Sequence, residues 1–344
     1  MANILFPPEW HPQSAIQLTW PHEDSDWGYM LEEISSCFVN IAREILQRQK
    51  LIIVCKDKDA VKFMLGECSN SPNLVLTEIK SNDTWARDHS AISVYTDGKP
   101  TLYDFTFNGW GLKFAANYDN QINRGLEKNK IFSPNIPLVN KKDFVLEGGS
   151  LETEGKGTLL TTSECLLSPN RNSYLSKGEI EEYLKSTFGL KRVLWLDHGY
   201  LAGDDTDSHI DTLARFCDER TIAYVKCEDK NDEHFDALQK MEMQLKSFLD
   251  FEGKPYRLIE LPMAKPVYFD GERLPATYAN FLIMNTAVLC PVYNDAATDD
   301  KAMEQLKKAF PEKEIVGIDC SAIIKEHGSL HCVTMQYPEG FINI

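Results

Sequence analysis

The sequence predicts an α/β fold built from repeated units, and two observations support this prediction. Apolar residues at helical spacing are followed several times by a short apolar strand. The predicted strand ends at Asp197, Glu260 and Asp319 recur at intervals of roughly 60 residues. An interval this long favours radial repetition or a solenoid over a doubly wound sheet. Because helix followed by strand occurs in any α/β protein, the pattern alone leaves the arrangement of the units open.

Five helix–strand units are expected along the chain. The first helix is indicated by apolar residues three or four positions apart, such as Ile34, Phe38, Ile41 and Ile45, and the third is ended by Gly189. The expected helix and strand of each unit are, in order, residues 31–46 and 51–55, 117–131 and 136–139, 177–188 and 191–197, 233–249 and 254–260, and 301–310 and 313–319. No low-complexity linker divides the chain, so we expect one domain over residues 1–344.

Composition excludes several classes of protein. The chain has 344 residues, of which 43% are hydrophobic, and a formal net charge of −16, which argues against nucleic acid as a partner. Its longest apolar run, residues 281–292, is short and interrupted by polar residues, so no membrane span is expected. The first residues lack the pattern of a secretory signal, and the nine cysteines form no C-x-x-C pair. We therefore expect a reduced, cytoplasmic protein.

The acidic stretch 204–211 holds the first candidate for chemistry. His209 lies two positions before Asp211, and in an extended backbone these two side chains would point the same way. The carboxylate would then orient the imidazole and raise its pKa. His327 and His331 are competing candidates, and a solvated acidic loop is the alternative without function. An EF-hand is excluded because the sixth position lacks glycine and the twelfth lacks glutamate.

Cys332 is the candidate nucleophile. Most cysteines are buried apolar residues, and the other eight, including Cys55, Cys290 and Cys320, are assigned to that role. Cys332 differs because His331 adjoins it and Gly328 permits a close backbone approach. The spacings of histidine and cysteine fit no zinc site, so no metal is expected.

Two further carboxylates lie beside groups that shape a pocket. Asp88 follows Trp85-Ala86-Arg87, which could equally form a buried ion pair beneath an aromatic ring, and Glu147 precedes Gly148-Gly149, which could equally form a plain turn. One cysteine, one histidine and several carboxylates suit a flat cation such as a guanidinium. Two carboxylates can grip its N–H groups and leave the central carbon open to a thiolate.

Eight motifs, spread over nearly the whole chain, occur together: Trp20-Pro21-His22, Trp85-Ala86-Arg87-Asp88, Phe107-Asn108-Gly109-Trp110-Gly111, Leu146-Glu147-Gly148-Gly149-Ser150, Leu166-Leu167-Ser168-Pro169-Asn170-Arg171-Asn172, Asp205-Thr206-Asp207-Ser208-His209-Ile210-Asp211, Ala279-Asn280-Phe281 and Leu330-His331-Cys332-Val333-Thr334. In this combination and order the sequence resembles the agmatine deiminases of the guanidine-modifying (pentein) superfamily. The resemblance implies a five-bladed pseudo-symmetric α/β propeller of repeated ββαβ units around a central active site.

The resemblance also implies roles for individual residues. Cys332 matches the nucleophile, His209 the general acid/base, Asp88 and Asp211 the carboxylates that hold the guanidinium, and Glu147 the acid that orients His209 or the substrate. The implied reaction forms a covalent amidino-thioether and converts agmatine to N-carbamoylputrescine and ammonia, a step of putrescine and polyamine biosynthesis. It needs neither metal nor organic cofactor.

Four more residues are assigned to substrate binding: Trp85, Trp110, Asp205 and Asn280. The two tryptophans would line the methylene chain, although both could equally belong to the core, and Asp205 would meet the distal amine. The sequence departs from the family where glycine is frequent, because Ser208 precedes the histidine and Glu326-His327 precedes Gly328. We expect the rim of the pocket, but not the chemistry, to differ there.

Three alternatives remain open at this stage. A bacterial peptidyl-arginine deiminase shares the motifs, an amidinotransferase or another guanidine hydrolase is a more distant enzyme, and a non-catalytic propeller that serves as a binding platform is a different class. The expected partner is a small cationic guanidine, and a homodimer is the default for such an enzyme.

Overall fold

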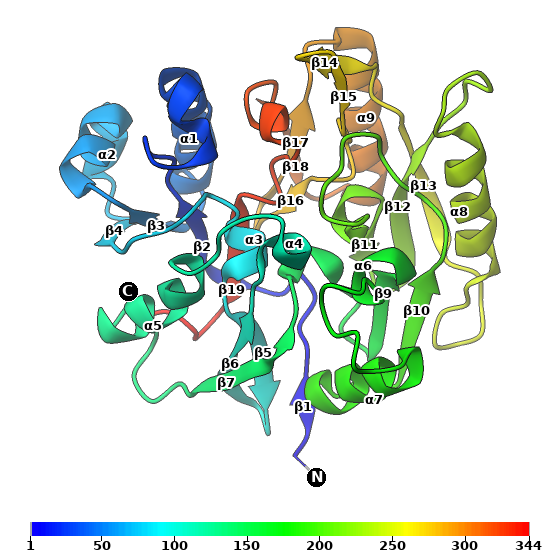
Figure 1. Cartoon of the computed structure of the whole chain (residues 1–344), viewed down its shortest axis with the longest axis horizontal. Helices are drawn as coiled ribbons and strands as arrows, with labels where there is room; N and C mark the ends of the chain where they lie inside the picture. The colour runs from blue at the N-terminus through cyan, green and yellow to red at the C-terminus, as the bar shows by residue number, and fades with distance from the viewer. Residues whose placement is uncertain (1, 344) are drawn as a thin grey trace.

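All five expected helix–strand units are present in the structure, a computed structural model that describes residues 2–343 (Figure 1). In each unit a helix joins two neighbouring parallel strands. The units are β2 (Gln13–Thr19), α1 (Leu31–Leu46) and β3 (Lys50–Cys55); β6 (Lys99–Thr106), α5 (Ile122–Lys128) and β7 (Leu138–Val145); β9 (Thr158–Thr162), α7 (Lys177–Phe188) and β10 (Arg192–Leu196); β12 (Thr221–Lys226), α8 (Phe235–Ser247) and β13 (Arg257–Pro262); and β17 (Ala287–Val292), α9 (Ala296–Ala309) and β18 (Glu314–Asp319). The expected α/β fold is confirmed.

A third, antiparallel strand completes the core of each unit. These strands are β5 (Ile92–Thr96) on β6, β8 (Glu152–Thr153) on β9, β11 (Ala214–Asp218) on β12, β16 (Leu282–Ile283) on β17, and β19 (Thr334–Pro338) on β2. Four of the five precede their parallel pair in the chain, whereas β19 comes from the C-terminal end and pairs with the N-terminal β2. The first and last parts of the chain therefore share one sheet.

The remaining elements extend or decorate these sheets. β4 (Leu74–Glu78) pairs with β3, and β1 (Ile4–Leu5) pairs with β5. β14 (Val267–Phe269) and β15 (Glu272–Leu274) form a hairpin. The other helices are α2 (Lys58–Leu65), α3 (Ala86–His89), α4 (Gly109–Leu112) and α6 (Ser163–Leu166).

Helix ends follow local chemistry. α7 begins at a capping box between Ser176 and Glu179 and ends at Gly189, whose φ of 67° lies in the left-handed region that glycine tolerates. α9 begins at Ala296, whereas the sequence predicted a start at residue 301. Asp299, in the first turn of this helix, is buried and accepts hydrogen bonds. Its carboxylate accepts from the Tyr278 hydroxyl at 2.6 Å and from the Tyr293 amide at 3.1 Å. A charged residue in an apolar pattern therefore hid the start of this helix.

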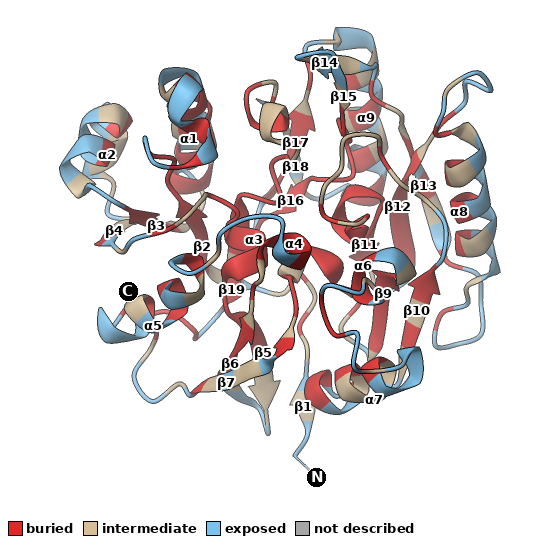
Figure 2. Ribbon diagram, in the orientation of Figure 1, coloured by how far each residue is buried: buried red, intermediate tan, exposed pale blue. Residues whose placement is uncertain are grey.

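Strands form the interior and helices the periphery. Figure 2 shows buried residues along the central strands, whereas α1, α2, α7 and α8 carry exposed residues on their outer sides. The nine cysteines are free, and Cys55, Cys290 and Cys320 are buried in the core as expected. Among residues 2–343, no helix combines the length and apolar character needed to cross a membrane.

Candidate active site

The candidate residues occupy equivalent places in the five units. Each lies a few residues before the antiparallel strand of its unit. The pairs are Asp88 and β5, Glu147 and β8, His209 with Asp211 and β11, Asn280 and β16, and Cys332 and β19. Short helices carry some of them, and α3, which contains Asp88, lies near the centre of the view in Figure 1. Residues far apart in sequence are thus positioned by the same structural feature, repeated five times.

A cavity with about 420 Å³ of empty volume opens beside Cys332. Five of the nine residues predicted from the sequence line it, namely Cys332, Asp88, Trp85, Trp110 and Asp205. The other lining residues are Asp26, Asp83, Phe114, Thr206, Glu326, His327 and Gly328. Five of the twelve side chains are carboxylates, and lysine and arginine are absent from this lining.

Asn280 contacts Cys332 rather than lining this cavity. Its Oδ1 lies 3.4 Å from Cys332 Sγ and accepts from the Cys332 amide at 3.3 Å. Its Nδ2 donates to the Asp211 carbonyl at 3.3 Å. The Arg87 amide donates to the Cys332 carbonyl at 3.1 Å, which joins this loop to the segment that carries Asp88. Cys332 is therefore held both through its sulfur and through its backbone.

The surroundings of Cys332 favour the protonated thiol. Burial raises its pKa well above the ordinary value, and the negative charges of Asp211 and Asp88 add to this effect. Asp211 Oδ2 lies 3.9 Å from Cys332 Sγ. A cation placed among these groups would favour the thiolate.

The Asp88 side chain accepts two hydrogen bonds, and its pKa is strongly raised. Its Oδ1 accepts from the Gly149 amide and its Oδ2 from the Trp110 indole, both at 2.9 Å. Burial raises its pKa well above the ordinary value, and Asp211 and Glu147 contribute through repulsion. A Cβ at Gly149 would lie 2.5 Å from His209 Nδ1, so only glycine fits this turn.

His209 is buried between two carboxylates without bonding to either. Its Nδ1 lies 3.7 Å from Asp88 Oδ1, and its Nε2 lies 4.0 Å from Glu147 Oε2. Within residues 2–343, neither nitrogen has a hydrogen-bond partner. Burial lowers the pKa of His209 to about 3, although Asp211 opposes the shift. Asp211 does favour the protonated imidazole, as expected, but desolvation outweighs this attraction and the net shift of the pKa is downward.

The predicted extended backbone around His209 is wrong. Asp207 and Ser208 have φ angles of 65° and 61°, and Asp211 lies in a 3-10 helix, Ile210–Thr212. Glycine would adopt the left-handed conformation of Ser208 without strain. His327, the other departure from the family pattern, has a φ of 65° as well. Both departures place a side chain where glycine would be unstrained.

Glu147 is held by an arginine whose role the sequence did not indicate. Both of its carboxylate oxygens lie 3.0 Å from Arg171 Nε, and both side chains are fully buried. Burial raises the pKa of Glu147, although the charge of Arg171 opposes the shift. Arg171 also pairs with Asp207, next to the histidine loop. Its place in the Ser168-Pro169-Asn170-Arg171 motif was the available signal.

Asp211 is oriented by a second buried histidine. Its Oδ2 lies 2.7 Å from His331 Nδ1, and His331 Nε2 lies 2.7 Å from Glu9 Oε2. Asp211 Oδ1 is buried and has no hydrogen-bond partner in the described part of the chain. Burial raises the pKa of Asp211, but the hydrogen bond and the charge of His331 outweigh it and keep the pKa below its ordinary value. One carboxylate oxygen is therefore free for a ligand.

Two tryptophans and an acidic rim form the rest of the cavity. The rings of Trp85 and Trp110 meet edge to face with centroids 6.2 Å apart. A Cβ at Gly328 would lie 2.1 Å from the Trp85 ring, which confirms the expected close approach at this glycine. Burial raises the pKa of Asp83 to about 8, and burial with repulsion from Asp204 raises that of Asp205 to about 6. The nearby His327 and Lys113 oppose the shift at Asp205.

Two buried clusters resemble metal sites in composition but not in charge balance. Glu147, Cys165 and His209 form one, and Glu9, Glu152 and His331 form the other. In each, the carboxylates are paired with a buried arginine, Arg171 in the first cluster and Arg215 in the second. The positive guanidinium beside each cluster would repel a metal cation, so these residues do not favour a metal ion.

Comparison with known proteins identifies the family. The sequence pattern of the Porphyromonas-type peptidyl-arginine deiminase family matches residues 5–338. The chain belongs to this family.

Three similar proteins align with nearly the whole chain. A Porphyromonas gingivalis structure, provisionally named an arginine deiminase, is 55% identical, with 99% of this chain and 100% of that chain covered and a TM-score of 0.94. A C. jejuni agmatine deiminase with bound substrate is 41% identical, with 98% and 97% covered and a TM-score of 0.91. The agmatine deiminase of Medicago truncatula is 31% identical, with 96% of each chain covered.

Proposed function

We propose that this family member is an agmatine deiminase, which hydrolyses agmatine to N-carbamoylputrescine and ammonia. The observation that carries the proposal is a cavity whose lining combines a thiol with five acidic side chains and contains neither lysine nor arginine. Agmatine is a dication, with a guanidinium at one end and an ammonium at the other, so both ends suit this lining. The substrate-bound C. jejuni enzyme and the Medicago enzyme are both named agmatine deiminases, and both align with nearly the whole chain.

The guanidinium would bind between Asp88 and Asp211. Each offers carboxylate oxygens on fully buried side chains, and Asp211 Oδ1 lacks a partner within residues 2–343. Burial, with repulsion from Asp211 and Asp88, raises the pKa of Cys332, and a bound cation offsets the repulsion, so ionisation of the thiol is coupled to substrate binding. The thiolate therefore forms together with substrate binding, because the cationic substrate stabilises it.

The buried, neutral His209 is suited to move one proton in each direction. It takes the thiol proton as Sγ bonds to the guanidinium carbon, then gives it to the leaving nitrogen as the C–N bond breaks and ammonia departs. In the second half it takes a proton from water as the water oxygen bonds to the carbon. The C–S bond then breaks, the sulfur takes this proton from His209 to restore the thiol, and the remaining hydroxyl proton passes to solvent as the carbonyl of N-carbamoylputrescine forms. Glu147, fixed by Arg171, would stabilise the transient imidazolium.

The distal ammonium would lie at the acidic rim. Asp205 is our proposed partner for it, and Asp83 and Glu326 line the same cavity. Trp85 and Trp110 would flank the methylene chain. Arginine carries a carboxylate near its distal amine, which these side chains would repel. The role of Asn280 is to position Cys332 rather than to touch substrate.

The arrangement of the units supports a five-bladed propeller formed by one domain. Five sheets share one core order, and β19 joins the last part of the chain to the first sheet. Site residues precede the same strand in every unit, which is what pseudo-fivefold symmetry around a central site requires. A cytoplasmic location and a homodimer stay predictions from the sequence, to be tested by cell fractionation and light scattering.

Other deiminase substrates are the main rivals, since relatives are named for arginine and for peptidyl-arginine. An ammonia-release assay with agmatine, free arginine and a blocked arginine peptide separates these activities. We expect turnover of agmatine and little from the other two. Comparable turnover of arginine or of the peptide would reject the substrate assignment. Turnover of none would favour a non-catalytic binding platform.

A further inference from the structure

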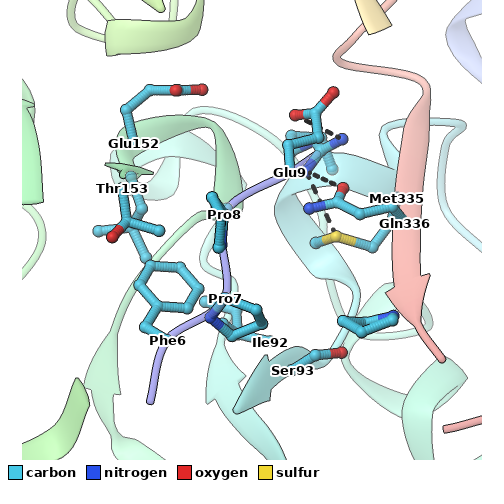
Figure 3. Close-up of a pocket in the computed structure, with 14 residues that line it drawn as sticks. Phe6, Pro7, Pro8, Glu9, Ile92, Ser93, Glu152, Thr153, Met335 and Gln336 are labelled. Carbon is cyan, nitrogen blue, oxygen red and sulfur yellow. Dashed lines mark hydrogen bonds and ion pairs between the residues drawn. The ribbon is translucent and has the colours of Figure 1, made fainter. Parts of the chain in front are cut away.

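A second cavity, with about 550 Å³ of empty volume, lies apart from the active-site cavity and shares no lining residue with it. Figure 3 shows the N-terminal segment from Phe6 to Glu9 running between Glu152 and Thr153 on one side and Met335 and Gln336 on the other. The charged side chains gather at one end of this view, whereas Phe6, Pro7 and Ile92 lie at the other. The cavity is therefore polar at one end and apolar at the other.

Arg87 supplies the cation at the polar end. It is 4% exposed, and its Nη1 donates to Gln336 Oε1 at 2.7 Å. Its Nε and Nη2 have no hydrogen-bond partner anywhere in residues 2–343, and the contact to Glu9 Oε2 is 4.0 Å long. A buried guanidinium with two free donors is costly unless a further acceptor is present. The burial also lowers the pKa of Arg87, with Arg215 adding to the shift and Glu9 opposing it.

The carboxylates around this cavity are already occupied. Glu9 Oε1 accepts from the Ile283 amide at 2.7 Å, and Oε2 accepts from Arg215 Nη2 at 2.6 Å. Glu152 accepts from Arg215 Nε and, at 3.1 Å, from the Phe216 amide. Every carboxylate oxygen thus has a donor, while Arg87 keeps two donors free. The unused hydrogen-bonding groups at this end are therefore the donors of the Arg87 cation.

The apolar end has its own unused donor. Phe6, Pro7, Pro8 and Ile92 present hydrocarbon to the cavity, and Ser93 lies among them with a buried hydroxyl that has no partner within the described chain. A short aliphatic group fits such surroundings better than a second charge. A ligand that suits both ends is a small anion with an aliphatic part.

We propose that this cavity is a binding site for a small aliphatic monocarboxylate, with the carboxylate on Arg87 and the alkyl part against Phe6 and Ile92. A carboxylate accepts two hydrogen bonds from a guanidinium in a fork, which matches the two free donors. The site is separate from the guanidine chemistry, and binding can be measured without any enzymatic turnover.

Butyrate is the probe, tested on the full chain at constant ionic strength by calorimetry and thermal unfolding. We expect butyrate to bind and to raise the Tm in a concentration-dependent manner, whereas butyramide and butylamine, of the same size but without the negative charge, do not. Soaking crystals with 4-bromobutyrate should give an anomalous bromine signal inside the cavity. Equal effects of butyrate and butyramide, or only ordered water in the cavity, would overturn the proposal.

Two variants locate the binding on opposite ends of the cavity. Arg87→Met removes the charge and should weaken butyrate binding at least tenfold, while Arg87→Lys, the matched control, should retain part of it. If Arg87→Met does not fold, Ser93→Leu decides, because it fills the apolar end without removing any hydrogen bond in the described structure. It should abolish butyrate binding and leave ammonia release intact. Unchanged binding in Ser93→Leu would contradict the assignment.

Discussion

Two fully buried histidines in this protein have similar surroundings and opposite bonding. His331 lies 2.7 Å from a carboxylate oxygen at each of its nitrogens, Asp211 on one side and Glu9 on the other. His209 also lies between two carboxylates, but at 3.7 and 4.0 Å, and without a hydrogen bond within residues 2–343. The comparison suggests that the fold satisfies the histidine that holds the site together and leaves unsatisfied the histidine that we propose to react.

This difference has an energetic meaning. A buried polar group without a partner costs about 1–3 kcal/mol, so His209 reduces the stability of the empty protein. The fold supports this arrangement with rigid neighbours, since Arg171 fixes Glu147 and the Gly149 amide fixes Asp88. A cationic substrate can then change the charge state of the site without moving its walls. The following variants, from the largest expected effect to the smallest, test the contrast between the two histidines and the site that they serve.

Replacing the unsatisfied histidine should affect rate and not stability. We expect His209→Ala to lower kcat for agmatine by about 10²–10⁴, because the proton carrier is lost. The Tm should stay the same or rise, since an unpaired buried polar group is removed. Steady-state kinetics and thermal unfolding of the same preparation measure both. A clear drop in Tm with normal kcat would invert our assignment.

Replacing the satisfied histidine should affect stability first. His331→Leu leaves Asp211 and Glu9 buried without their shared partner, which should cost about 3–5 kcal/mol of unfolding free energy. Urea denaturation measures this loss. His331→Gln, which can keep one of the two hydrogen bonds, is the matched control and should recover part of it. A leucine variant as stable as the wild type would show that the two contacts contribute little.

The acidic rim should make substrate capture depend on pH. Because burial raises the pKa of Asp83 to about 8, this group is neutral below that pH and negative above it. Its attraction for the cationic substrate therefore grows with rising pH, and kcat/KM for agmatine should increase roughly three- to tenfold between pH 7 and 9. Asp83→Asn should remove that part of the rise. Identical pH profiles for variant and wild type would exclude Asp83 from the effect.

The strained residue beside His209 should give the smallest effect. Ser208 has a φ of 61°, so Ser208→Gly should relieve strain and raise stability by up to about 1 kcal/mol. The gain is limited by loss of the 3.1 Å hydrogen bond from Ser208 Oγ to Glu164. Ser208→Ala loses that bond but keeps the strain, and it should be less stable than wild type. Thermal unfolding ranks the three, and alanine above glycine would contradict this account.

The sequence predicted the repeated elements better than the bonds that join them. Apolar spacing marked the helices of four units, because one face of each must be buried, whatever its partner, and the second unit was placed from the room left between residues 55 and 197. Residues between elements were harder to place. The extended geometry assumed for His209 and Asp211 was wrong because two successive residues, Asp207 and Ser208, adopt left-handed conformations without being glycine.

Long-range partners were beyond local patterns. Glu9 and His331 bond across 322 positions of sequence, and Arg171 and Glu147 across 24. No spacing rule connects such pairs, since their contact depends on how the units are arranged. Motif resemblance identified Cys332, Asp88 and Glu147 as site candidates, but it did not show that burial lowers the pKa of His209 in the empty site.

Mass spectrometry of the covalent intermediate tests the central claim most directly. The claim is that the Cys332 sulfur attacks a guanidinium carbon while His209 handles the proton. After incubation of His209→Ala with agmatine and acid quenching, peptide mapping should place an amidino-type adduct on Cys332. The adduct should be absent in the double variant that also carries Cys332→Ser. An adduct on another cysteine such as Cys165, or normal turnover of agmatine by Cys332→Ser, would contradict the account.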